Sequence, residues 1–123
     1  MDENQLRGIL GLSMVSKNAV CGEGPCLKCL RSGQCELLLV DADASTNTKA
    51  MYKNACDYRS VPLAFLPGGF LRQALGRDCM AMAMKKSGLT VKVRSLLEDQ
   101  IVNPALKREE KLTDRNVGGV NVV

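Results

Sequence analysis

The sequence contains no histidine and no tryptophan, and only two phenylalanines and two tyrosines among 123 residues. Without histidine there is no Ser–His or Cys–His nucleophile pair, no imidazole ligand and no side chain that normally exchanges protons at neutral pH. With so few aromatic rings, the chain has little with which to stack the bases of a single strand. Any chemistry must come from cysteine, lysine or carboxylate groups. No base–nucleophile pair can be named, so we expect no enzyme.

Long hydrophobic runs are also missing. The longest strand-like apolar block covers residues 37–40, whereas a membrane-spanning helix needs roughly 18–20 apolar residues. The first four residues, Met1-Asp2-Glu3-Asn4, carry acids where a signal peptide carries bases, so we expect a cytoplasmic location and no membrane contact. Seventeen Lys and Arg against thirteen Asp and Glu give a net charge of +4, which favours a polyanionic partner. Nothing indicates a cofactor or a small-molecule substrate.

Apolar spacing alternates between helical and buried-strand patterns along the chain. Helices are predicted over residues 4–12, 25–31, 46–57, 70–75 and 89–101. Strands are predicted as a stub at 19–21 and as buried runs at 36–40, 61–66 and 80–84, with Met80, Met82 and Met84 on one core face. Helices that alternate with buried strands predict an α/β fold, a three-layer α/β/α sandwich.

The last residues differ in character from the rest. Asn103-Pro104 should end the preceding helix, and a mixed-charge run follows it. We therefore expect a folded domain over residues 1–102 and a flexible C-terminal tail over residues 103–123. The alternative is an interaction tail that ends in a short, sticky strand.

Six cysteines, at positions 21, 26, 29, 35, 56 and 79, raise the question of a metal. The spacing Cys21-x4-Cys26-x2-Cys29 is typical of plant-type iron–sulfur ferredoxins, and the last pair could also hold zinc. Cys26 and Cys29 fall inside a predicted helix, however, and neither a second such pair nor a histidine is present. Buried structural thiols are the favoured interpretation, and no disulfide is expected in a cytoplasmic protein. Cys21 precedes a helix N-terminus, which would lower its pKa.

Two loops are candidates for binding. In the first, residues 22–25 form a glycine-containing turn before a helix, and Lys28 follows one turn later. Free backbone N–H groups and the helix dipole would make a phosphate site there. The second loop, residues 74–79, has Arg72 shortly before it and Arg77 near its end. The alternative for both loops is an ordinary solvated turn.

The order of these motifs resembles the L-seven-Ae and L-thirty-e superfamily of ribosomal proteins, which bind kink-turn RNA, and within it the bacterial YlxQ-type branch. The resemblance covers roughly residues 5–100. Its most specific part is the Asp-Ala-Ser-x-Asn-Thr string at residues 43–48 after a buried strand. The other matching stretches are residues 10–14, 22–23, 27–33, 37–40, Tyr58 with Val61-Pro62, and 71–76.

This resemblance implies an L-thirty-e-like sandwich with a small mixed sheet and a non-enzymatic RNA-binding function. Such proteins grip kink-turn or similarly bent RNA through a helix N-terminus and an adjacent loop. Gly22 matches the family's turn glycine and Lys28 its phosphate-contacting lysine, whereas Gly24 and Pro25 stand where the family has an Asn-Glu pair that reads guanines. The expected RNA-binding residues are Gly22, Glu23, Gly24, Lys28, Arg31, Arg77, Asp78, Cys79 and Met80.

Two other functions stay open at this point. One is a protein-interaction module on the same fold, because neither Gly24 nor Pro25 has a side-chain hydrogen-bonding group. The other is a thiol or metal-binding protein built on the first three cysteines. The expected partners are structured RNA, either kink-turn or ribosomal, and ribosomal proteins, with association to the ribosome.

Overall fold

The structure is a computed structural model that describes residues 2–103. Helices and strands alternate along these residues, as the sequence predicts. The elements are α1 (Glu3–Val15), β1 (Ala19–Cys21), α2 (Glu23–Arg31), β2 (Cys35–Asp41), α3 (Thr46–Arg59), β3 (Leu63–Leu66), α4 (Phe70–Leu75), β4 (Ala81–Lys85), α5 (Gly88–Leu96) and a 3-10 turn, η1 (Glu98–Gln100).

The strands form one mixed sheet in the order β1-β4-β2-β3. β2 and β3 run parallel, with Leu38 opposite Leu63, and α3 makes the crossover between them. β4 runs antiparallel to both of its neighbours, so that Met82 lies opposite Leu39 of β2 and Cys21 of β1. In consequence β1, β2 and β3 finish at the end of the sheet where β4 begins.

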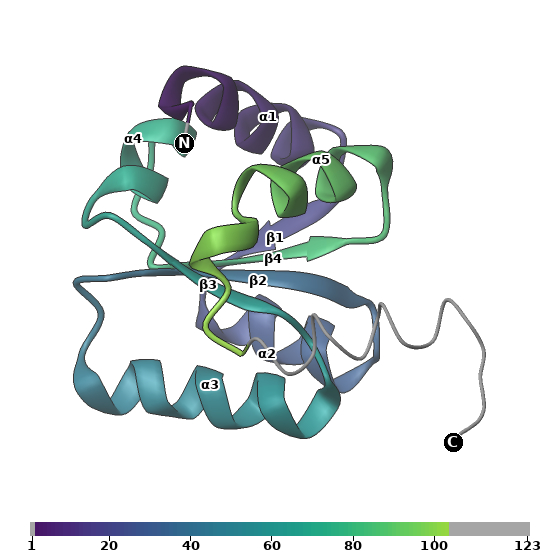
Figure 1. Ribbon diagram of the computed structural model, residues 1–123, viewed down its shortest axis with the longest axis vertical. Coiled ribbons are helices and arrows are strands. Elements are labelled where there is room, and N and C mark those ends of the chain that lie inside the picture. The colour runs from purple at the N-terminus through teal and green to yellow at the C-terminus, as the bar shows by residue number, and fades with distance from the viewer. Residues whose placement is uncertain (1, 104–123) are drawn as a thin grey trace.

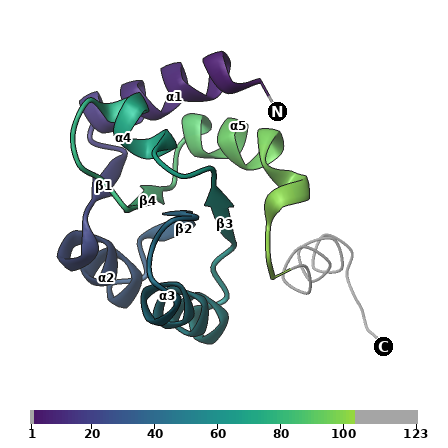
Figure 2. The ribbon, with the colours of Figure 1, turned by 90° about the vertical axis from the view of Figure 1, so that its left-hand side faces the viewer.

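Helices cover both faces of the sheet. Figures 1 and 2 show α1, α4 and α5 on one face and α2 and α3 on the other. The predicted three-layer α/β/α sandwich is confirmed. No helix within residues 2–103 is long and apolar enough to cross a bilayer.

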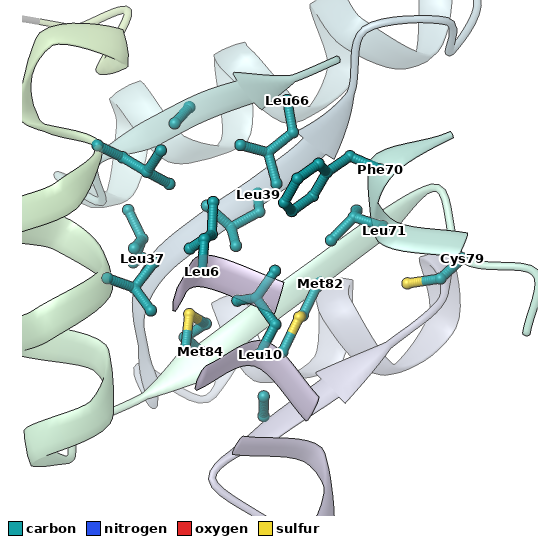
Figure 3. Packing of buried hydrophobic residues seen from close by; sticks show 14 of the residues in the cluster. Leu6, Leu10, Leu37, Leu39, Leu66, Phe70, Leu71, Cys79, Met82 and Met84 are labelled. Carbon is teal, nitrogen blue, oxygen red and sulfur yellow. The ribbon is translucent and has the colours of Figure 1, made fainter. Parts of the chain in front are cut away.

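The two faces of β4 carry side chains of different size. Met82 and Met84 point into a core rich in leucine, between the sheet and α1, α4 and α5 (Figure 3). Ala81 and Ala83 face a core rich in cysteine, against α2 and α3. Met80 lies before the strand and is 38% exposed, so the predicted methionine face starts at Met82 rather than Met80.

Two predicted helices have different bounds in the structure. α2 begins at Glu23, two residues before the predicted start. Pro25 is tolerated at its third position because the first N–H that bonds within the helix is that of Cys26, to the Gly22 carbonyl. α5 ends at Leu96, not at residue 101. The helical spacing of apolar residues extends to Ile101 in the sequence because Ile101 is also buried. It is not helical but forms an antiparallel bridge with Ala64 on the free edge of β3.

Asn103 closes the described part of the chain and is buried. Its side-chain oxygen accepts from the Leu63 N–H at 3.1 Å, and its side-chain nitrogen donates to the Val61 carbonyl at 3.0 Å and the Asp57 carboxylate at 3.2 Å. Of the predicted tail over residues 103–123, this residue alone is described, and residues 104–123 lie outside the described range.

Candidate nucleic-acid interface

A hollow of about 420 Å³ opens at the end of the sheet where β4 begins. Three segments surround it: the start of α2, the start of α3, and the loop between α4 and β4. Its lining residues are Gly22, Glu23, Ala44, Ser45, Thr48, Tyr52, Asp78, Cys79, Met80 and Ala81. The structure thus brings the two predicted loops together and adds a third wall, from α3, that the sequence analysis did not include.

The N-terminus of α2 differs from those of the other long helices. The N-caps of α1, α3 and α5 are Asp2, Ser45 and Ser87, and each side chain accepts a backbone N–H of its first turn. The N-cap of α2 is Gly22, which has no side chain to do so. Its φ of 101° and ψ of 158° lie in a region that favours glycine. The start of α2 is therefore left open to an external acceptor.

The backbone amides at this helix start are not all available. The Gly22 N–H donates to the Ala81 carbonyl at 2.9 Å, because β1 and β4 pair up to this point. This corrects the expectation that the backbone N–H groups of this turn are free, as far as Gly22 is concerned. The N–H groups of Glu23 and Gly24 have no acceptor within residues 2–103. Two donors at the positive end of the helix dipole remain for an anion.

The wall from α3 adds a hydroxyl and a phenol. The Ser45 hydroxyl accepts from the Thr48 N–H at 3.1 Å and donates to the Thr48 hydroxyl oxygen at 2.9 Å. With its oxygen used as an acceptor, the Thr48 hydroxyl has its own hydrogen to donate. Tyr52 is 1% exposed. Burial, chiefly, raises the pKa of Tyr52, with smaller contributions from Cys26 and Glu23, so its hydroxyl stays protonated.

The loop between α4 and β4 is tied to β1 by a covalent bond. Cys79 forms a disulfide with Cys21, 58 residues earlier, with the two Cα atoms 6.0 Å apart. The expectation of no disulfide is wrong for this pair, because antiparallel pairing of β1 with β4 brings Cys21 next to the residues that precede β4. The bond also removes the free thiolate expected at Cys21. Beside it, Asp78 forms an exposed ion pair with Arg72 at 3.2 Å.

The two basic residues predicted on α2 lie away from the hollow. Lys28 lines a neighbouring groove of about 500 Å³, on the β1 side of α2, together with Lys85 at the end of β4. Gly24 also lines this groove rather than the hollow. Arg31 is the exposed last residue of α2, roughly 12 Å along the helix axis from Glu23 at 1.5 Å per residue. Arg77 is exposed in the loop beyond α4.

The other four cysteines, Cys26, Cys29, Cys35 and Cys56, are free and buried in the cysteine-rich core. Burial raises the pKa of Cys26 and of Cys56 to about 12, so both thiols are protonated at neutral pH. No group of three or more metal-ligating side chains lies together in residues 2–103. With Cys21 bonded to Cys79, the ferredoxin-like triplet is not assembled as a set of ligands.

A buried carboxylate links the loops that follow β2 and β3. Asp41, 2% exposed, accepts the Asp43 N–H at 2.7 Å and the Gly69 N–H at 2.8 Å. The loops after β2 and β3 are thereby held together. They approach so closely that a Cβ atom at Gly68 would lie 2.0 Å from a carboxylate oxygen of Asp43. A side chain at position 68 would require the Asp43 carboxylate to move.

Comparison with known proteins bears on this arrangement. No family model matches the chain. Over 92 residues, the chain is 29% identical to the RNA-binding protein YlxQ of Bacillus subtilis (strain 168), a match that covers 73% of this chain and 92% of that protein. The predicted resemblance to the YlxQ-type branch is confirmed.

Solved structures show the same fold. A protein of unknown function from Bacillus halodurans superposes with a TM-score of 0.71 at 23% identity, covering 76% of this chain and 96% of that one. The Giardia lamblia 15.5kD RNA binding protein gives a TM-score of 0.65 at 19% identity, with coverages of 86% and 91%. These likenesses extend over nearly all of the described residues and support the fold assignment.

Proposed function

We propose that this protein binds structured RNA and catalyses no reaction, and that the hollow is the centre of its RNA interface. The observation that carries the proposal is the open start of α2, where the Glu23 and Gly24 amides have no acceptor within residues 2–103 and Glu23 shares the hollow with Cys79. The similarity to a protein named as RNA-binding, over 73% of this chain, supports it.

In this proposal the start of α2 holds one phosphate of the RNA backbone. The Glu23 and Gly24 amides donate to its oxygens, and the helix dipole adds to the attraction. Lys28 and Lys85, which share the neighbouring groove, neutralise the phosphates that follow. A footprint of about 3–5 phosphates predicts a slope of log K against log salt near −2 to −4.

The hollow itself takes an unstacked base. Ala44, Tyr52 and Met80 supply apolar lining, and the Thr48 hydroxyl supplies a donor. RNA is read most often where bases are splayed out of the helix and can enter a pocket of this kind. The Glu23 carboxylate, which also lines the hollow, repels phosphate and accepts from a base amino group instead.

We propose kink-turn RNA, ribosomal or regulatory, as the target because its backbone is sharply bent. Gly24 and Pro25 offer no side-chain hydrogen bonds, so recognition here depends on shape and backbone contacts more than on guanine readout. Association with the ribosome and its proteins in the cytoplasm belongs to this proposal. So does the division into an RNA-binding domain over residues 1–102 and a tail over 103–123.

The test is a titration of the full chain against a folded kink-turn RNA and against a variant RNA that lacks the sheared G·A pairs, across a salt series. The proposal predicts binding to the intact kink-turn that is tighter by about 100-fold, equivalent to about 2.7 kcal/mol. Equal, salt-sensitive binding to both RNAs would show that the protein binds RNA phosphates without recognising the kink-turn. Binding to neither would contradict it and favour a protein-interaction module on the same fold.

A further inference from the structure

We propose that Cys21 and Cys79 are a redox-modified pair that controls RNA affinity, with a low-molecular-weight disulfide as the oxidant. The inference depends on the proposed function, because it concerns the same hollow. Cys21 is the last residue of β1, directly before the open start of α2, and Cys79 lines the hollow from the opposite loop. Their bond therefore joins the two loops that would hold the RNA.

Little else fixes the loop of residues 77–80 to α2. These residues have no helical or strand structure. The Arg72–Asp78 ion pair is exposed, with side chains 60% and 96% accessible, and an exposed pair contributes little. The Asp41 N–H donates to the Met80 carbonyl at 2.8 Å, which ties the loop to β2. Within the described part of the chain the disulfide is the covalent link from the loop to β1 and the start of α2, and its loss would leave the loop freer to move relative to α2.

The fold accommodates the reduced pair as well. The Cys21 sulfur lies 3.9 Å from the Asp78 carbonyl oxygen, and the Cys79 sulfur lies 3.3 Å from that of Ala81. As thiols, both side chains would have a carbonyl that accepts the S–H. Reduction therefore leaves no polar group without a partner, and a change of redox state does not require the chain to unfold.

The remaining cysteines are poor competitors for this exchange. Cys21 and Cys79 belong to the leucine-rich core, on one face of the sheet, whereas the four free thiols belong to the cysteine-rich core on the other. The sheet separates the two sets. The fold therefore determines which two cysteines exchange with the small disulfide.

The chemical step is thiol–disulfide exchange. The sulfur of Cys79, a residue that lines the hollow and is 4% exposed, attacks one sulfur of a small disulfide RS–SR and releases RS⁻, which takes up the thiol proton. The Cys21 sulfur then attacks the protein sulfur of this mixed disulfide, forms the Sγ–Sγ bond and releases the second RS⁻ with its proton. Two electrons pass from the protein to the small disulfide, which leaves as two RSH molecules.

The oxidised protein is expected to bind RNA about tenfold more tightly than the reduced protein, because an already tethered loop has fewer side chains to order on binding. The linkage is reciprocal, so bound RNA should stabilise the disulfide against reduction by the same factor. An RNA base in the hollow would also lie over Cys79, which lines it, and hinder the approach of a reductant.

The experiment compares kink-turn RNA affinity of the full chain after oxidation by a small disulfide and after reduction by a dithiol, at one salt concentration. Free-thiol counting and peptide mass mapping verify four thiols and a 21–79 link in the oxidised sample, and six thiols in the reduced one. The double variant Cys21→Ala/Cys79→Ala should bind as the reduced protein does in both conditions. Cys56→Ala, which leaves the pair intact, should keep the redox response.

Each outcome decides one question. Tenfold tighter binding by the oxidised protein, absent in the double variant, supports the inference. Equal affinity in the two verified redox states overturns the inference and leaves the proposed function standing. A sample that keeps six free thiols after oxidation overturns the inference as well. Failure of both forms to bind any RNA overturns the proposed function and the inference together.

Discussion

At the end of the sheet where β4 begins, the Glu23 and Gly24 amides have no acceptor within the described residues, and Glu23 and Thr48 line a hollow. At the opposite end, where β3 begins, the side chain of Asn103 instead makes three hydrogen bonds to the protein itself, one of them to the Leu63 N–H. We call these the site end and the far end. The same strands run through both, but the site end has helix N–H groups beside the hollow, those of Glu23 and Gly24, that have no acceptor in residues 2–103.

The difference lies partly in how the helices at the site end begin. A glycine N-cap is less favourable than a side-chain cap by only a few tenths of a kcal/mol, and α2 has the glycine at the site end while α3 has the side-chain cap from Ser45. Donors left without protein partners at a surface hollow are the ones that an RNA can use. At the far end, the hydrogen bonds of Asn103 hold the start of β3 and the end of α3 together instead.

The largest expected effect is at Asp41, which supports the site end from inside. Replacing Asp41 with Ala leaves the Asp43 and Gly69 N–H groups without their acceptor. We expect a loss of about 3 kcal/mol in the free energy of unfolding, measured by urea denaturation. RNA affinity should fall as well, because the loops after β2 and β3 separate. An unchanged affinity in folded Asp41→Ala protein would show that these loops do not position the interface.

The matching change at the far end is Asn103→Ala. It removes the acceptor for Leu63 and the donor to Val61 and Asp57, so we expect a loss of about 2 kcal/mol in the free energy of unfolding. RNA affinity, measured at a temperature where the variant is folded, should stay within twofold of the unmodified chain. A large loss of affinity would contradict the division of roles between the two ends.

Charge reversal in the groove beside α2 should change affinity without changing stability. Lys28→Glu is expected to weaken binding to all RNAs alike by about tenfold at low salt, and to make the salt slope shallower. The matched control is Lys92→Glu, an identical charge change at an exposed site on α5, on the opposite face of the sheet. Equal losses in the two variants would assign the effect to net charge rather than to the groove.

The smallest effect concerns the acid dependence of the far end. The pKa of Asp57 is lowered chiefly by the hydrogen bond from Lys53, with a smaller part from Asn103. Because the folded pKa lies below the unfolded one, this stabilisation is complete above pH about 4 and is lost as pH falls through the folded pKa. The pair is exposed, so less than about 1 kcal/mol is expected. Unfolding of Asp57→Asn at pH 7 and pH 3 should show a smaller difference than the unmodified chain.

Much of the fold follows from local signals in the sequence. Ser45 predicts the start of α3 because its side chain can cap the helix, and Gly76 ends α4 with a φ of 69° that suits glycine. The end of α5 could not be predicted in this way. Leu97 and Ile101 keep the helical spacing, yet they are buried by a 3-10 turn and an edge bridge, which depend on the position of β3.

Only part of the candidate site could be predicted from such local signals. Both loops were predicted, and the string at residues 43–48 was the most specific part of the resemblance. Its place as the third wall of the hollow, however, follows from the packing of α3 beside α2. The Cys21–Cys79 bond joins residues 58 apart in sequence. To predict this bond, one must know that β1 pairs with β4, and no local sequence pattern gives that pairing.

The most direct test of the account follows amide chemical shifts of the isotope-labelled full chain during titration with kink-turn RNA. The account predicts the largest changes at the site end, at Glu23, Gly24, Thr48 and residues 77–80, with small changes around Tyr58 and Arg59 at the far end. Largest changes at the far end, or changes spread evenly over both ends, would contradict the claim that the hollow between α2, α3 and the Cys79 loop is the RNA interface.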